Sequence, residues 1–372
     1  MRFVAGLLFL AASVGFVDAG DAYQKDINLI VKQGSGTPAG RAAWERLSQA
    51  KADALPAILE AMNTKDIVVA NWLRTAFDRI VDRERKTIDA DKILAFVKNP
   101  AKEGRTRRFA LELVERLKSG TRDQLYLDWL DDPEFRFEAV ALELDKAKKA
   151  AKAGNSLISV NLYRRAFDKS RDVMQAREAA SGLEDNGVKV SVAQHLGFLT
   201  DWHLIGPFPG KGQKGLDNAY TPERKVDLAE EFDGQKGKVR WKRYQVKEPV
   251  NTSKERHQAL VDLREKRALG DADDAVAFAF TAFSVEKAMR AEMRGAADDN
   301  FAVFVNGVKV FSFEEWRNGV RHDRHRFPVQ LKAGENTVLV KVSQSSAPNP
   351  EPNWEFFLRV VDATGKGISM KR

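Results

Sequence analysis

The segment from Glu314 to His325 gathers the side chains best suited to ligand recognition. It carries one aromatic plane, three planar cationic donors and one short acceptor: Trp316, Arg317, Arg321, Arg324 and Asp323. Proteins recognise sugars by placing an aromatic face under the ring and by making paired polar contacts to its hydroxyl groups. We therefore predict a ligand-binding loop here, with Trp354 beside it. In the alternative interpretation, Trp316 caps a hydrophobic core and the arginines are solvated.

The sequence gives weaker signals for catalysis or metal binding than for ligand recognition. The chain has no cysteine, no His-Glu-x-x-His and no Gly-x-Ser-x-Gly. His322 and His325 form the only histidine cluster, but on a strand they would point to opposite faces, and neighbouring arginines would repel a cation. Several acidic residues could hold a structural calcium or act as turn residues: Asp271, Asp273, Asp274, Asp298 and Asp299. We expect no enzyme and no cofactor beyond such a calcium.

The elements that position these residues change character along the chain. Within residues 40–185, hydrophobic residues recur at helical spacing, as in the set Leu55, Ile58, Leu59, Met62 and the set Phe137, Val140, Ala141, Leu144. Short polar or Pro-containing breaks separate these runs, so we predict successive helices. The alternatives are stacked repeats and an irregular bundle.

The second half favours strands. Val188, Val190 and Val192 alternate, and a longer strand is predicted in 198–209. Asn306-Gly307 is typical of a type I′ turn between alternating segments. Further strands are predicted at 276–280, 327–331, 338–342 and 354–361. Short strands at this spacing indicate a β-sandwich.

Two stretches resemble known families. Asp132 to Val140 resembles the helix-opening segment of HEAT-type repeats. Asp299 to Gly307, followed by Leu331 to Val342, resembles the galactose-binding-like jelly roll, a sandwich attached to many glycoside hydrolases as a sugar-binding or accessory module. These resemblances imply a multidomain α and β protein. An α-helical HEAT-like domain spans 20–190, and a jelly-roll β-sandwich spans 191–372.

The N-terminus indicates export. Met1-Arg2, an apolar run and Val17-Asp18-Ala19 fit a signal peptide over residues 1–19, so we expect a periplasmic or secreted protein. No later apolar run could span a membrane. The net charge of +8 is mixed along the chain and does not predict nucleic-acid binding. The expected function is non-catalytic binding or scaffolding, with carbohydrate or an envelope protein as partner. The alternatives are a purely structural component and an accessory part of a polysaccharide-degrading system.

Overall fold

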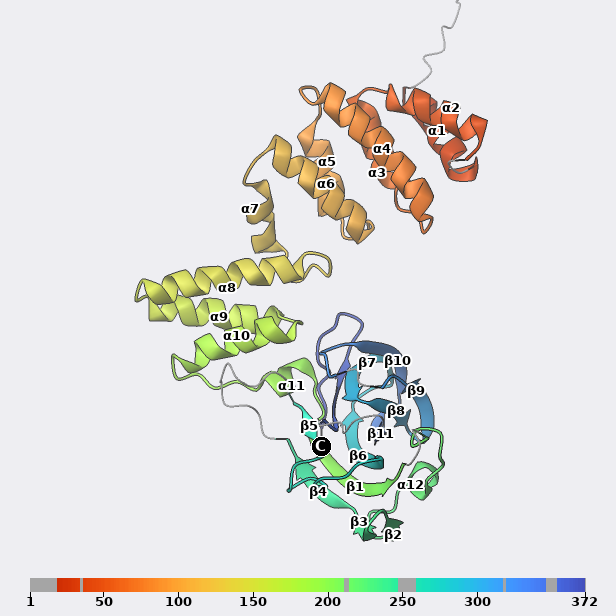
Figure 1. Ribbon diagram of the computed structural model, residues 1–372. Coiled ribbons are helices and arrows are strands. Elements are labelled where there is room, and N and C mark those ends of the chain that lie inside the picture. Colours follow the sequence, from red (N-terminus) through yellow and green to blue (C-terminus); the bar gives the residue numbers. More distant parts are fainter. Residues whose placement is uncertain are drawn as a thin grey trace, which may run out of the picture. The chain divides into compact units, whose positions relative to one another are not determined.

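The computed structural model describes residues 19–33, 36–210, 214–246, 259–316, 319–345 and 353–371 (Figure 1). The proposed signal residues 1–18 and Arg317 lie outside this description. In the described ranges, no helix has the length and apolar character needed to cross a membrane. The chain divides into two compact units, Met1–Asp128 and Trp129–Arg372.

The first unit is built from helices. In order, they are α1 (Ala19–Gln33), α2 (Pro38–Ser48), the short 3-10 helix η1 (Ala52–Ala54), α3 (Leu55–Ala61), α4 (Ile67–Glu84), α5 (Ala90–Lys98), α6 (Gly104–Leu117) and α7 (Thr121–Asp128). Asp66 caps α4 by accepting hydrogen bonds from the Val68 and Val69 amides. Leu55, Ile58 and Leu59 are fully buried, which confirms the predicted face of this helix.

The second unit opens with three more helices, α8 (Arg136–Lys152), α9 (Ser156–Lys169) and α10 (Val173–Glu184), followed by the short α11 (Val192–Leu196). Val140 and Leu144 are buried as predicted, but Phe137 is 56% exposed. The buried face of α8 runs through Ala139 and Ala147 instead. The strand predicted at 188–192 is wrong, because Ser191 caps α11 and Val192 is its first residue.

Two antiparallel sheets follow in the same unit. The larger has the order β4 (Lys242–Gln245), β1 (Asp201–Pro209), β6 (Ala275–Val285), β11 (Gly334–Gln344), β8 (Asn300–Val305) and β9 (Val308–Phe313). The smaller has the order β10 (His325–Leu331), β7 (Met289–Asp298), β12 (Glu355–Val361) and β5 (Val261–Asp262). A small hairpin, β2 (Glu231–Gly234) and β3 (Gly237–Arg240), and the short helix α12 (Thr221–Arg224) complete the unit.

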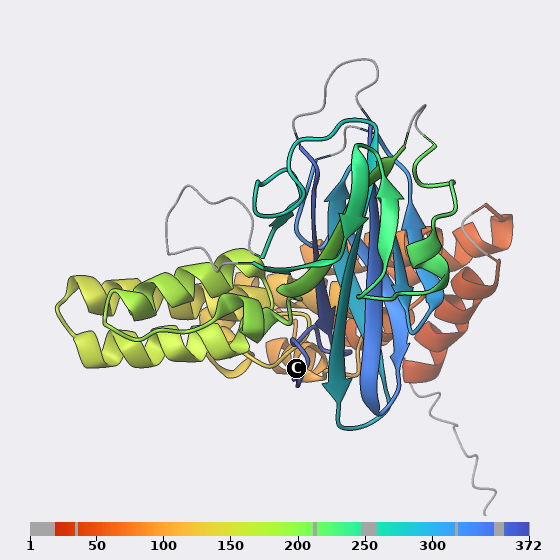
Figure 2. The same cartoon turned by 90° about the horizontal axis from the view of Figure 1, so that it is seen from below.

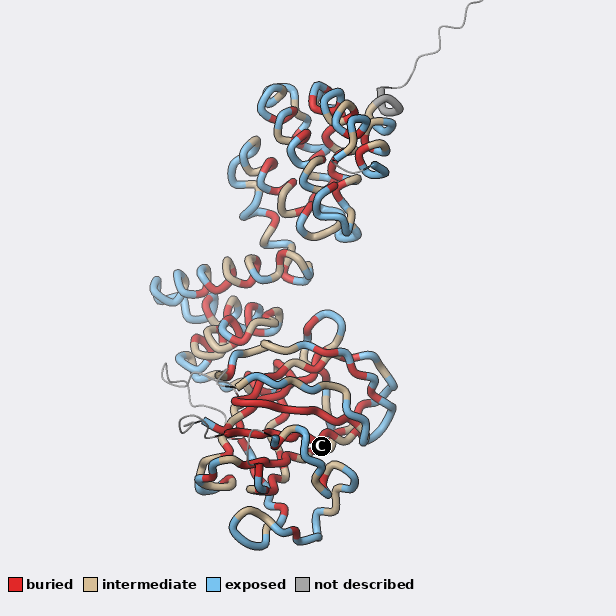
Figure 3. The backbone as a smooth tube through the Cα atoms, turned by 45° about the vertical axis from the view of Figure 1, so that its right-hand side comes forward, coloured by how far each residue is buried: buried red, intermediate tan, exposed pale blue. Residues whose placement is uncertain are grey.

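The two sheets share one hydrophobic core. Figure 2 shows their long strands side by side, and Figure 3 shows buried segments along the strands. Val303 and Val340 enter it from the larger sheet, and Met293 and Leu358 enter it from the smaller one. The Asn306-Gly307 turn has φ of 50° and 79°, which confirms the type I′ hairpin between β8 and β9. The structure therefore confirms the predicted order of a helical part followed by two packed antiparallel sheets.

The expected boundary at 190/191 lies near the change from helix to strand. The division into compact units falls at 128/129, and α8 to α11 lie in the same unit as the sheets. Arg359 of β12 gives a physical reason. Its side chain is fully buried and donates to the main-chain oxygens of Arg171 and Leu196, both at 3.3 Å. Arg136 of α8 also donates to the Thr364 oxygen at 2.9 Å.

Candidate functional site

The loop predicted to bind ligand is largely engaged in internal contacts. Asp323 accepts from Arg359 Nε at 2.7 Å and from Arg294 Nη1 at 3.2 Å, and it also pairs with Arg359 Nη2. Arg324 pairs with Glu315 and lies over the Phe313 ring. Asp323 is thus the centre of a buried ion-pair cluster that fastens the loop to the smaller sheet. Removing charged partners from such a site is costly.

The other predicted site residues are dispersed. Trp354 is fully buried in the core between the sheets, so its ring presents no face to a ligand. Trp316 is half-buried and Arg321 is exposed. Arg317 lies outside the described residues. Of the predicted residues that the structure describes, Arg321 is the most accessible, and Trp316 and Arg324 are each partly buried.

The two clustered histidines lie in different surroundings. The His322 ring packs on Phe357 at 4.7 Å between centroids, whereas the His325 ring packs on Phe313 at 4.0 Å and on Phe311 at 5.3 Å. Within the described residues, no group of three or more His, Asp or Glu side chains is arranged to hold a metal ion. Arg264 pairs with Asp271 and Asp273, and Asp274 accepts from the Ser345 hydroxyl at 3.1 Å.

A row of three carboxylates crosses the smaller sheet at neighbouring strands. Glu355 of β12 stands directly opposite Asp298 of β7 and Asp262 of β5. The neighbouring residue on each strand faces the core: Val261, Ala297 and Phe356. Because side chains alternate along a strand, the three carboxylates lie on the opposite face of the sheet. Burial and the charges of Asp262 and Asp298 raise the pKa of Glu355 to about 7. We call Asp298, Glu355 and Asp262 the acidic row.

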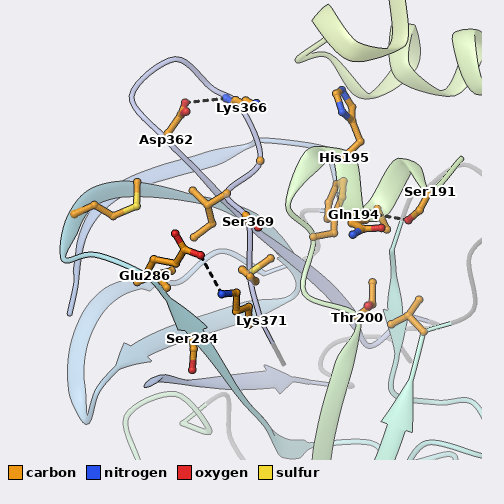
Figure 4. A pocket seen from close by; sticks show the side chains of 18 of the residues that line it. Ser191, Gln194, His195, Thr200, Ser284, Glu286, Asp362, Lys366, Ser369 and Lys371 are labelled. Carbon is orange, nitrogen blue, oxygen red and sulfur yellow. Dashed lines mark hydrogen bonds and ion pairs between the residues drawn. The ribbon is translucent and has the colours of Figure 1, made fainter. Parts of the chain in front are cut away.

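A large pocket lies at the end of the sandwich where β6 turns into β7. Its walls come from α11, from the end of β4 with Arg267, from the β6–β7 turn and from the C-terminal segment 362–371. The cavity volume is about 1570 Å³. Polar and apolar side chains share its lining. Figure 4 shows the polar residues Ser191 and Gln194 on one side and Glu286 and Lys371 on the other. We call this cavity the C-terminal pocket.

Two glycines hold the C-terminal segment against α11. Gly197 ends α11 in the left-handed conformation, with φ of 76°. A Cβ on Gly367 would lie 2.4 Å from the Gly197 nitrogen, so this approach is open only to glycine. The segment then pairs with β6, where the main chains of Ser284 and Lys371 exchange hydrogen bonds of 2.8 and 3.1 Å. The pocket walls are therefore fixed by main-chain contacts.

His195 lines the pocket at its upper rim in Figure 4. Its Nε2 lies 3.1 Å from the Ser170 oxygen, and since a carbonyl only accepts, Nε2 is the donor. The ring also packs on Phe167, with 4.3 Å between ring centroids. Burial lowers the pKa of His195, so the imidazole is neutral at pH 7.

Sequence reasoning missed the C-terminal pocket because its lining residues come from five separated segments of the chain. No short motif marks it: its polar residues are single serines, glutamines and lysines that read as solvated surface. The nearest signal is Gly365-Lys366-Gly367, a glycine-rich stretch directly after the last strand. No protein-family model matches the chain, and no curated protein matches it either.

Proposed function

We propose that this chain is an exported, non-catalytic protein that binds a stretch of polysaccharide in the C-terminal pocket. The size of the pocket carries the proposal. Its volume of about 1570 Å³ exceeds the roughly 300–1,000 Å³ that is usual for pockets holding one small ligand. A cavity of this size has room for several linked sugar rings.

The lining chemistry supports a polyhydroxylated ligand. Gln194 and Gln245 are exposed, and their amides can both donate to and accept from sugar hydroxyls. Ser369 adds an exposed hydroxyl from the C-terminal segment. These groups stand on elements held by main-chain hydrogen bonds, so a ligand would meet a preformed surface.

His195 contacts a serine, Ser170, that does not line the pocket, and this contact favours binding over catalysis. The Ser170 hydroxyl donates to the Phe167 oxygen at 2.8 Å, and the residue is fully buried. His195 Nε2 in turn donates to the Ser170 carbonyl. This geometry presents no activated serine to the pocket.

The family expectations belong to the same proposal. The two-sheet sandwich is compatible with a jelly-roll sugar-binding module, and the helices are compatible with a HEAT-like scaffold. Export to the periplasm or the outside of the cell is supported by the sequence pattern of residues 1–19. The proposal also includes a structural calcium, to which we assign no ligands.

Binding of the purified protein to a glycan array tests this function. The double variant Gln194→Ala/Gln245→Ala should bind the best glycan at least fivefold more weakly and melt at the same temperature, because both side chains are exposed. Gln124→Ala, an exposed amide on α7, is the matched control. Absence of binding to every glycan, or equal affinities of the double variant and the wild type, would overturn the proposal.

A further inference from the structure

The charges that line the C-terminal pocket do not balance. Two acidic residues line it, Glu286 and Asp362. Four permanently basic residues face them: Arg267, Lys287, Lys366 and Lys371. His195 adds no charge near neutral pH. This excess of two positive charges attracts a ligand only if ion pairs within the protein do not neutralise it.

Both acidic groups are already engaged. Glu286 pairs with Lys371 at 3.0 Å. The Asp362 carboxylate accepts from the amides of Thr364 and Lys366, at 2.8 and 3.0 Å, and from the Thr364 hydroxyl at 2.7 Å. These hydrogen bonds and nearby Arg171 lower the pKa of Asp362, although burial acts in the opposite direction. Asp362 therefore serves the turn that shapes the C-terminal segment.

One of the remaining cations is also committed. The Arg267 guanidinium donates to Glu265, to the Gln245 oxygen at 2.9 Å and to the Tyr244 hydroxyl at 3.0 Å. It also lies over the Tyr244 ring, 4.4 Å from the centroid. Its donors are thus used in holding the wall at the end of β4, and its charge is offset by Glu265.

Lys287 and Lys366 are different. Both are exposed, and among the described residues the ammonium group of neither takes part in an ion pair or a hydrogen bond. Lys287 stands on the β6–β7 turn and Lys366 stands on the C-terminal segment, which are two separate walls of the pocket. The pocket therefore keeps two uncompensated positive charges on different walls.

We infer that the polysaccharide bound by this pocket is anionic, a chain whose sugar rings carry carboxylate or sulfate groups. The inference rests on the proposed function and adds the class of ligand. Lysines on two walls fit a chain whose charge repeats along its length, whereas a neutral glycan would leave both ammonium groups without a partner. Ammonium groups form charge-assisted hydrogen bonds with carboxylate and sulfate oxygens.

Two matched pairs of polymers test the ligand class with the full-length protein. Polygalacturonate is compared with its methyl-esterified form, and dextran sulfate is compared with dextran, by affinity electrophoresis or calorimetry. We expect at least tenfold tighter binding of one anionic polymer than of its neutral counterpart. The pair that shows this preference distinguishes carboxylate from sulfate. Binding should weaken as NaCl is raised from 0.05 to 0.5 M, values chosen to shorten the screening length severalfold.

A pair of double variants locates the effect. Lys287→Gln/Lys366→Gln should lose at least tenfold in affinity for the preferred anionic polymer. Lys149→Gln/Lys152→Gln removes the same charge from exposed positions on α8 and should change the affinity less than twofold. Equal losses in both variants would assign binding to the general basic surface and overturn the inference.

The polymer comparison separates the two proposals. Equal binding of charged and neutral polymers, or binding only to a neutral glycan on the array, overturns the anionic ligand and leaves the proposed function standing. Absence of binding to any polysaccharide overturns the proposed function itself.

Discussion

Replacing Glu355 by Gln should stabilise the protein at alkaline pH. Glu355 is the middle member of the acidic row, directly opposite Asp298 and Asp262 on adjacent strands. Cβ atoms of residues paired in this way lie about 4.5–5.5 Å apart, and like charges at that separation destabilise a sheet. Asp298 is 2% exposed, and its Oδ1 has no hydrogen-bond partner within the described residues. Gln keeps the shape of the side chain and removes the central charge.

The size of the effect follows from the pKa of Glu355, which rises from 4.5 to about 7 because of burial and its two acidic neighbours. At 1.36 kcal/mol per pH unit, this rise sets an upper limit of roughly 3–4 kcal/mol. Because Glu355 keeps some contact with solvent, we expect a gain of about 1–2 kcal/mol at pH 8.

The sign of the pH dependence is fixed by linkage. Between pH 4.5 and 7 the folded protein holds a proton on Glu355 that the unfolded chain has released. The contribution of Glu355 to the free energy of unfolding therefore falls as the pH rises through this window. The advantage of Glu355→Gln should be near its minimum at pH 4.5 and reach its full value above pH 7. Burial also lowers the pKa of His195, but this group is common to both proteins and its contribution cancels in the difference.

Urea denaturation at pH 5 and pH 8 measures this difference, with Glu335→Gln, an exposed carboxylate at the start of β11, as the control. An NMR titration of the Glu355 carboxyl reads its pKa directly. If Glu355→Gln shifted stability equally at both pH values, or destabilised the protein at pH 8, the reasoning would be wrong.

Two further substitutions test the loop from Glu314 to His325. Asp323→Asn removes the carboxylate that meets fully buried Arg359, so it should cost about 3–5 kcal/mol of unfolding free energy; a loss below 1 kcal/mol in urea denaturation would contradict the ion-pair cluster. Trp316→Ala should change the unfolding free energy by less than about 1 kcal/mol, because the ring is only half-buried. A loss of about 3–5 kcal/mol would place Trp316 in the core, and weaker glycan binding by a stable variant would return this loop to the binding surface.

Most elements could be predicted from local patterns. The helical face of Leu55, Ile58 and Leu59, the capping residue Asp66 and the Asn306-Gly307 hairpin all follow from interactions within a few residues. Strand β7 was not predicted, although it is central in its sheet. Its core-facing residues include Ala291 and Gly295, which carry little hydrophobic signal. A Cβ on Gly295 would lie 2.7 Å from the Phe357 oxygen. The close approach of β12 therefore requires a glycine here, and that glycine weakens the hydrophobic alternation of β7.

The sequence by itself determined the order of helices followed by strands, because side-chain periodicity and turn chemistry act over short distances. It also marked Glu314–His325 as a charged segment between strands. Only the tertiary structure decided that Asp323 meets Arg359, that Trp354 lies in the core, and that α11 and the C-terminal segment enclose one pocket. These outcomes depend on strand register and on contacts between residues far apart in the chain. Such contacts are selected by the packing of the whole unit, and no local pattern encodes them.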